Sequence, residues 1–461
     1  MNPSKVQITT KFALRFSVGL YLLGALLALG LPEHYIETFY FLARAHWLFV
    51  PPSFSARLVL LWCCMTIPLL IVASREGRRI DWRVVLLPLA LVCLASAWVK
   101  PPHSPDIYTS VGHGRQVMLG VNPYSWTLLQ TPVVDNVILN VHMLSRNWVQ
   151  MPCMYGPLYL VIMLLVNVFS PSPDLFVLGP MVKLSILPAY FLWGWVLWRV
   201  WEKHPYRSLL LLTVVANPVA IFLFCVEGHV DIFMIAALAL TAYFLDRNSG
   251  VAAGLAFCAA ASIKMVPVPT FPVLACWIWR KDSKSGIQFS ATFLLSYLGS
   301  HFALSGGEWE AVARLGREWQ DFLWSGLLPR LFLLANLNDV VLMSRVATGI
   351  LCLTVGLLCL LILRDKFQDS PSFAAGLVYV VVVLTHTHVR PWYSFWFWPL
   401  FWMSSQDRRY ILVSAALCST TTLFSLWHTL MEYVPYVNAI AIALDLSWRY
   451  WCHRHPQTDD A

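Results

Sequence analysis

The sequence predicts an all-α polytopic membrane protein, and three observations support this fold class. Hydrophobic residues make up 58% of the chain and charged residues only 12%, about half the charged share of a soluble domain. Apolar runs long enough to cross a bilayer recur along most of the chain. The 22 Trp and 17 Tyr suit a protein with two membrane interfaces, where amphipathic rings anchor. Lipid must therefore form part of its solvent.

The apolar runs predict roughly 12 to 15 transmembrane helices. They lie near residues 12–32, 56–74, 84–99, 155–170, 178–199, 208–225, 230–246, 251–279, 287–304, 345–363, 371–388, 393–404, 410–428 and 433–449. We expect residues 16–31 to form a retained first helix, because no small-residue cleavage site follows them. The run 251–279 is interrupted by Lys264 and three prolines, which predicts a broken helix or two short ones.

Basic residues between the runs indicate which helix ends face the cytoplasm. The net charge of +8 comes from short clusters between apolar runs, which excludes a nucleic-acid-binding stripe. Counting membrane crossings from these clusters places three loops on the non-cytoplasmic side: residues 100–154, 305–344 and 386–392. One conflict remains, because the basic segment Arg199–Arg207 also falls outside. The cytoplasmic clusters are Lys5/Lys11/Arg15, Arg75–Arg83, Arg280–Lys284, Arg364/Lys366, Arg408/Arg409 and Arg449–Arg454.

Domain organisation and cysteine usage are simple. We expect one membrane domain over residues 1–461, with its largest outer loop at 100–154, which is too long for a plain connector. The 11 Cys fall mostly inside apolar runs, and none has zinc-ligand spacing with His. Buried thiols are therefore favoured over a metal site or a disulfide framework. No cofactor is predicted.

Asp106 is the first residue that could carry chemistry. It follows Pro105 beyond an apolar helix, so it could simply start a short helix as its N-cap. A carboxylate at the outer interface could instead act as a general base on a hydroxyl group. His113 and Arg115 follow within about three helical turns and could face a phosphate. Asn122-Pro-Tyr124 is a turn signal.

Ionisable residues also interrupt apolar runs further along the chain. Glu227-Gly-His229-Val-Asp231 is costly between two helices unless water or a ligand receives it, although a tight polar hairpin would explain it equally well. The two acids flanking a His could also hold a metal, for which no other cluster gives support. Lys264 is a site candidate by the same argument, with snorkelling as the alternative.

The segment His386-Thr-His388-Val-Arg390-Pro-Trp392-Tyr393 lies in the third outer loop. Its cations could bind a lipid phosphate at headgroup depth. Its rings could pack against a polyprenyl chain or the face of a sugar.

The order of these motifs resembles that of the polyprenyl-phosphate-mannose-dependent alpha-1,6-mannosyltransferases, multi-pass enzymes of the GT-C fold. The resemblance covers roughly residues 84–405, although this family tends to have Asn where the chain has Val230. The matching segments are Asp106-Ile-Tyr108, Leu119-Gly-Val-Asn122-Pro-Tyr124, Tyr155-Gly-Pro-Leu, Asn217-Pro, Glu227-Gly-His229-Val-Asp231, Lys264 and Arg390-Pro-Trp392-Tyr393.

The resemblance implies a GT-C glycosyltransferase in the cell (inner) membrane. It would move a sugar, with mannose expected, from a polyprenyl-phosphate donor to a glycan or glycolipid acceptor on the non-cytoplasmic side. Asp106 would be the base and transfer would invert the sugar. Arg390, Lys264, His113 and Arg115 would bind the donor phosphate. Substrate-site candidates are Tyr108, Asn122, Tyr124, Tyr155, Glu227, His229, Asp231, His388, Trp392 and Tyr393.

A transporter or lipid flippase is the alternative, because many helices, Pro-broken segments and intramembrane charges suit it equally. The long loop at 100–154 and the lack of a detectable repeat between the halves count against it.

The distribution of Lys and Arg predicts that Asp106 and Arg390 face the same, non-cytoplasmic side. Cysteines introduced beside them should react with an impermeant thiol reagent in intact cells, on a background cleared of exposed native Cys. Labelling only after the membrane is opened would invert this topology.

Overall fold

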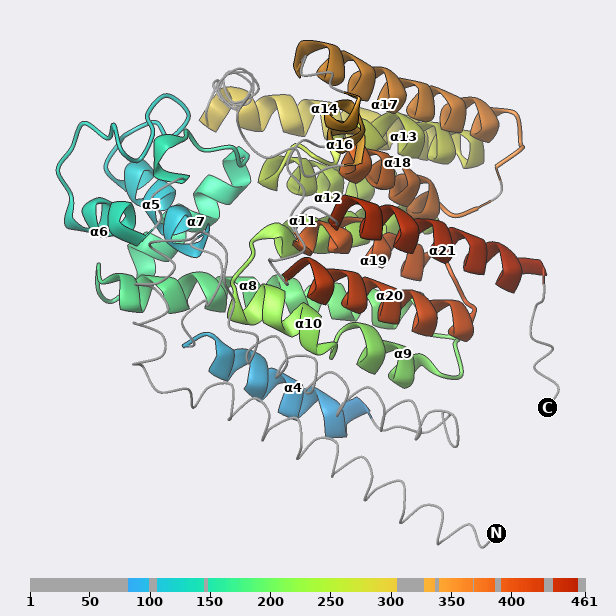
Figure 1. Cartoon of the computed structure of the whole chain (residues 1–461), viewed down its shortest axis with the longest axis horizontal. Helices are drawn as coiled ribbons and strands as arrows, with labels where there is room; N and C mark the ends of the chain where they lie inside the picture. The colour runs from blue at the N-terminus through green and yellow to red at the C-terminus, as the bar shows by residue number, and fades with distance from the viewer. Residues whose placement is uncertain are drawn as a thin grey trace, which may run out of the picture. The chain divides into compact units, whose positions relative to one another are not determined.

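Figure 1 shows the computed structural model of the chain, which is built from helices. It describes residues 82–98, 106–144, 148–304, 327–335, 340–367, 369–385, 391–426 and 434–454. Within these ranges no β-strand occurs, so the predicted all-α class is confirmed. The runs predicted at 12–32 and 56–74 lie outside the described residues.

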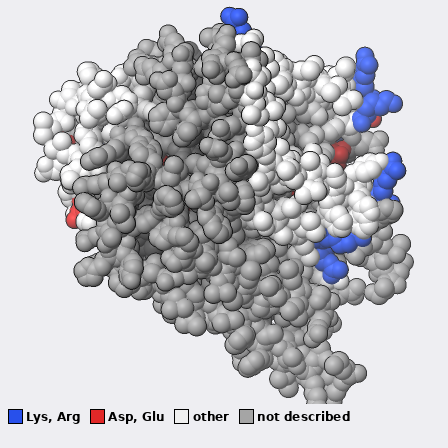
Figure 2. Space-filling view, in the orientation of Figure 1, with Lys and Arg blue, Asp and Glu red and all other residues white. Residues whose placement is uncertain are grey.

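Two described helices are long and apolar enough to cross a membrane: α8 (Leu175–Val200) and the Leu342–Leu363 part of α17 (Val340–Leu363). Only 11% of the most apolar window of α17 is buried, so this helix turns its apolar side chains outward, as a lipid-facing span does. In the view of Figure 2 most of the described surface is likewise uncharged. The segments Arg207–Val214 and Val219–Val226 pass the same test only when taken together, across a 48° bend, and counted as one span they make a third. The total of 12 to 15 stays a prediction.

The chain divides into two compact units, and each is discontinuous in sequence. Unit 1 comprises residues 1–103, 201–227 and 405–461, and unit 2 comprises residues 104–200 and 228–404. The described elements of unit 1 are α4 (Trp82–Ser96), α9 (Arg207–Val214), α10 (Pro218–Ile221), the π-helical turn η2 (Phe222–Val226), α20 (Arg408–Leu426) and α21 (Val434–Arg454).

Unit 2 holds the remaining described elements, in which α12 packs against α11 and α14, and α13 packs against α14 and α17. Besides α8 and α17, these elements are α5 (Asp106–Met118), α6 (Asn136–Leu144), η1 (Trp148–Gln150), α7 (Pro157–Phe169), α11 (Asp231–Asp246), α12 (Gly250–Ile263), η3 (Val268–Thr270), α13 (Phe271–Lys281), α14 (Ser283–Leu304), α16 (Leu327–Leu334), α18 (Pro371–Thr385), η4 (Pro391–Trp396) and α19 (Trp398–Met403). The run predicted to break at Lys264 is therefore two short helices.

The predicted outer loop folds around α5, which packs on α7 and α6. Asn167 on α7 donates hydrogen bonds from Nδ2 to the carbonyl oxygens of Val111 (3.2 Å) and Met163 (2.9 Å). Gly114 on α5 lies against the same backbone, because a Cβ there would stand 2.3 Å from the Met163 oxygen. The Asn122 turn is confirmed, since its Oδ1 accepts a hydrogen bond from the Tyr124 backbone N–H at 2.9 Å. Close helix contact thus sets the position of α5.

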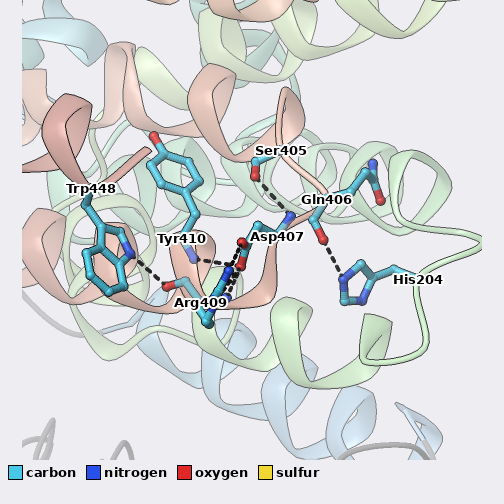
Figure 3. A network of polar contacts seen from close by, with 7 residues as sticks. All are labelled: His204, Ser405, Gln406, Asp407, Arg409, Tyr410 and Trp448. Atoms are coloured by element: carbon cyan, nitrogen blue, oxygen red, sulfur yellow. Dashed lines mark hydrogen bonds and ion pairs between the residues drawn. The ribbon is translucent and has the colours of Figure 1, made fainter. Parts of the chain in front are cut away.

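Unit 1 contains most of the basic segment Arg199–Arg207, whose side of the membrane stays a prediction. The His204 ring is 2.8 Å from the Gln406 carbonyl oxygen (Figure 3). The Arg408 guanidinium stands 4.0 Å from the Tyr206 ring centroid. Residues 204–207 therefore share one end of unit 1 with a cluster predicted to be cytoplasmic. The run 155–170, counted as a span, is only the 13-residue α7, about 20 Å long against a bilayer core of about 30 Å. The number of crossings, and with it the side that each cluster faces, stays a prediction.

Gly114→Ala should lower the thermal unfolding midpoint of the purified protein in detergent. The added methyl meets backbone, which cannot rotate away, and such overpacking costs roughly 1–3 kcal/mol. Gly299→Ala is the matched control, because nothing lies within 4 Å of a Cβ at that helical glycine. It should leave the midpoint unchanged or raise it slightly. Equal midpoints for the two variants would contradict this packing.

Candidate active site

The candidate site lies in unit 2, where the first residue of α5 meets the turn that precedes α11. Asp106 begins α5, as predicted, and its side chain is 21% exposed. The Asp106 Oδ2 atom is 3.7 Å from Nδ1 of His229, whose side chain is 1% exposed. That separation is longer than a hydrogen bond, and catalytic contacts are often loose without substrate. Two motifs 123 positions apart in sequence thus face one another.

Gly228 makes this approach possible. Its φ of +77° lies in the left-handed region, which a residue with a Cβ adopts only under strain. A Cβ at Gly228 would also stand 3.0 Å from the Ile107 side chain and 3.4 Å from that of Lys183. The glycine therefore lets the backbone turn close beside α5, and it brings His229 to Asp106.

Asp231, two residues further on, is the second acid of the site. Its side chain is only 2% exposed. Oδ1 accepts hydrogen bonds from Lys264 Nζ and from Trp396 Nε1, both at 2.9 Å. Burying a carboxylate is costly unless a cation and hydrogen bonds compensate it, and Asp231 has both.

Lys264 stands directly after α12, with the extended backbone angles φ −153° and ψ 133°. Its ammonium lies over three aromatic rings, with Nζ 5.4 Å from the Tyr155 centroid, 5.1 Å from Tyr393 and 4.7 Å from Trp396. Tyr393 and Trp396 stack on each other at 3.7 Å. An ammonium has three N–H donors, and Asp231 accepts from one of them. The side chain is 16% exposed, so the cation could also meet a ligand.

The segment before α7 places Tyr155 beside this lysine. The Gly156 N–H donates to the Ile263 carbonyl oxygen at 3.0 Å, and a Cβ at Gly156 would be 2.4 Å from the Ser262 oxygen. The Tyr124 hydroxyl donates to the Tyr155 carbonyl oxygen at 2.9 Å. The Tyr155-Gly156 segment thus joins the predicted outer loop to the end of α12. The glycine alone does not indicate this in the sequence.

Two residues expected to face a phosphate have other partners. The His113 ring is 3.1 Å from Gln116 Oε1, and burial lowers the pKa of His113 to about 4 against the smaller effect of that hydrogen bond. Its ring is therefore neutral at pH 7. Arg115 donates from Nε and Nη2 to Asp135 Oδ2 at 3.1 and 2.9 Å. No contact given for the described residues joins either side chain to Asp106 or Lys264, and their phosphate role stays a prediction.

The remaining predicted residues are dispersed. His388, Arg390 and the side chain of Trp392 lie outside the described residues. Glu227 is buried and belongs to unit 1. Tyr108 is buried on α5.

Two residues of this region did not emerge from the sequence reasoning. Trp396 donates a hydrogen bond to Asp231. In the sequence it lies in an aromatic run that is typical of a hydrophobic core. Lys183 is 1% exposed on α8 and lies beside Gly228. An ionisable residue inside an apolar run was a usable signal for it.

Among the residues that the structure describes, no three His, Cys, Asp or Glu side chains are grouped as a metal site would require. The site instead offers a partly exposed carboxylate beside an imidazole, and an ammonium surrounded by aromatic rings. That arrangement can accept a proton at one end and hold an anion at the other.

A family model described as alpha-(1->6)-mannopyranosyltransferase, N-terminal domain, matches residues 20–281. The chain belongs to this family. It is a glycosyltransferase of the membrane, and its substrates are a sugar donor and an acceptor. The matched region contains Asp106, His229, Asp231 and Lys264, whereas Tyr393 and Trp396 lie beyond it. No curated protein and no solved structure matches the chain.

Lys264→Met should destabilise this glycosyltransferase strongly, because it leaves the buried Asp231 carboxylate without a cation. Removing one partner of a buried pair costs roughly 3–5 kcal/mol. Adding Asp231→Asn to Lys264→Met should recover part of that loss, as measured by thermal unfolding in detergent. Arg280→Met is the control. Its partner Asp365 has a 71% exposed side chain, so this variant should lose at most about 1 kcal/mol. Equal losses from the two lysine and arginine variants would refute the buried pair.

Proposed function

We propose that the protein transfers a mannosyl group from a polyprenyl-phosphate donor to a glycan or glycolipid acceptor on the non-cytoplasmic side of the inner membrane. We assign it the GT-C fold and an inverting single displacement. The observation that carries the proposal is the contrast between its two acids. Asp106 is partly exposed beside His229, whereas Asp231 is buried against Lys264.

Asp106 is proposed as the general base. A base must reach the acceptor hydroxyl, and of the two carboxylates Asp106 is the more exposed. It takes the proton as the acceptor oxygen attacks the anomeric carbon from the face opposite the phosphate. The bond between that carbon and the phosphate oxygen breaks, and polyprenyl phosphate leaves with the electron pair. His229, buried behind Asp106, is proposed to position the carboxylate.

Lys264 is proposed to stabilise the leaving phosphate. Negative charge grows on the phosphate as the sugar departs, and a fixed cation in a site shielded from water stabilises that charge well. Asp231 then acts as a positioning residue, because it holds the ammonium in place. Arg390 is a second phosphate candidate from the sequence, since a guanidinium can form two parallel hydrogen bonds to phosphate.

The transporter reading is not retained. The chain belongs to a family of transferases, and the site contains a candidate base and a candidate anion site. A transporter would not need this combination.

Asp106→Asn should reduce mannosyl transfer roughly 10²–10⁴-fold, the usual contribution of a general base. Transfer is measured with radiolabelled polyprenyl-phosphate mannose on membranes that hold equal amounts of wild-type and variant protein. Asp174→Asn is the matched control, because Asp174 is exposed and also starts a helix, where Oδ1 accepts from the Phe176 N–H at 2.9 Å. It should retain wild-type transfer. Near-normal turnover by Asp106→Asn would remove Asp106 from the mechanism.

A further inference from the structure

Basic side chains from three helices gather at one end of unit 1. We call them the basic cap, which we define as Lys203, Arg207, Arg408, Arg409, Arg449 and Arg454. They stand at the starts of α9 and α20 and at the end of α21, and α20 packs on both other helices. Figure 3 shows two of the contacts that join the three helix ends: the His204 ring with the Gln406 oxygen at 2.8 Å, and Trp448 Nε1 with the Arg409 oxygen at 3.4 Å.

Aromatic rings accompany four arginines of the cap. The distances from guanidinium carbon to ring centroid are 4.0 Å for Arg408 and Tyr206, 4.6 Å for Arg454 and Tyr450, 5.2 Å for Arg409 and Trp451, and 5.6 Å for Arg449 and Tyr410. A ring attracts a cation without cancelling its charge. The rings therefore order the guanidinium groups without neutralising their charge.

Carboxylates compensate only part of this charge. Asp407 pairs with Arg409 at 2.9 Å, as Figure 3 shows. Asp445 is buried and accepts from the Tyr410 hydroxyl at 2.7 Å. Arg408 and Arg454 have ring partners, and the structure gives neither a carboxylate partner among the described residues. Glu202, next to Lys203, is a third acid, so six basic residues stand against three acidic ones and this end of unit 1 is net positive.

Two of the aromatic residues that accompany the cap are themselves exposed. Tyr450 is 57% exposed and Trp451 is 41% exposed, and Trp451 stacks on Trp448 at 4.7 Å. Amphipathic rings beside cations are typical of the headgroup depth of a bilayer.

We propose that the basic cap binds the anionic headgroups of phospholipids in the leaflet that it faces. Its cations are spread over three helix ends next to exposed rings, which suits a layer of headgroups better than one small anion. Attraction of juxtamembrane cations to an anionic leaflet has the required strength. The binding is independent of the transferase chemistry proposed above, because all residues of the cap belong to unit 1 and the candidate site belongs to unit 2.

The test uses the purified full-length protein in a neutral detergent. Thermal unfolding is followed while phosphatidylglycerol or phosphatidylcholine is added to the micelles. Phosphatidylglycerol should raise the midpoint, and phosphatidylcholine should raise it less. The double variant Arg408→Gln/Arg454→Gln should need on the order of tenfold more phosphatidylglycerol for half of its effect. If this variant does not fold, Arg454→Gln alone carries the test, because it lies in the exposed last turn of α21.

Arg247→Gln/Lys284→Gln is the matched control. It removes the same charge, and Arg247 also lies over a ring, 3.7 Å from the Tyr243 centroid, but in unit 2. This control should keep the wild-type response to phosphatidylglycerol. Equal loss in both double variants would show a non-specific charge effect and overturn the proposal. Stabilisation of the wild type by inorganic phosphate to the same extent would identify a site for soluble anions, and would also overturn it.

Discussion

A buried carboxylate in an apolar helical protein needs a cation and hydrogen bonds, and the site of this glycosyltransferase is organised around one such carboxylate. Asp231 brings together Lys264 from the end of α12 and Trp396 from η4. Because both donors reach one oxygen, α11, α12 and η4 have little freedom to shift at this point. The apolar run is interrupted at the residue that reaches this carboxylate, since α12 ends at Ile263 and Lys264 has an extended backbone.

Chemically similar side chains acquire different roles here from their surroundings. Asp106 and Asp231 each begin a helix, yet one is partly exposed beside an imidazole and the other is buried against an ammonium. His113 and His229 are both buried, yet one is bound to a neutral amide within its own helix and the other faces a carboxylate. In the Glu227–Asp231 motif, the turn at Gly228 directs His229 and Asp231 to two different parts of the site.

The sequence predicts the helical fold well, because apolar runs report burial in lipid or protein wherever the chain is long enough to cross. It also predicts the break at Lys264, since prolines and a charge interrupt the run there. It says less where length or distance decides. The run at 155–170 has the composition of a span and forms a helix of 13 residues. His113 and Arg115 are near Asp106 in sequence, whereas the partners that the structure gives them are Gln116 and Asp135. Their phosphate role stays a prediction. Trp396 was missed because its partner is 165 positions away, and no local pattern encodes such a pairing.

The interleaving of the two units bears on how the protein is made. Unit 1 begins with segments that leave the ribosome early, and it includes α9 and α10, but its last helices come after residue 404. Helices α9 and α10 therefore emerge long before α20 exists to pack on them, with a delay on the order of ten seconds or more at usual rates of synthesis. The side chain of Asn217 illustrates the cost, since its Nδ2 finds the Ser419 hydroxyl at 2.6 Å only after nearly the whole chain has been inserted. Until then the Asn217 amide needs another hydrogen-bond partner, because an unpaired polar group is costly in an apolar environment.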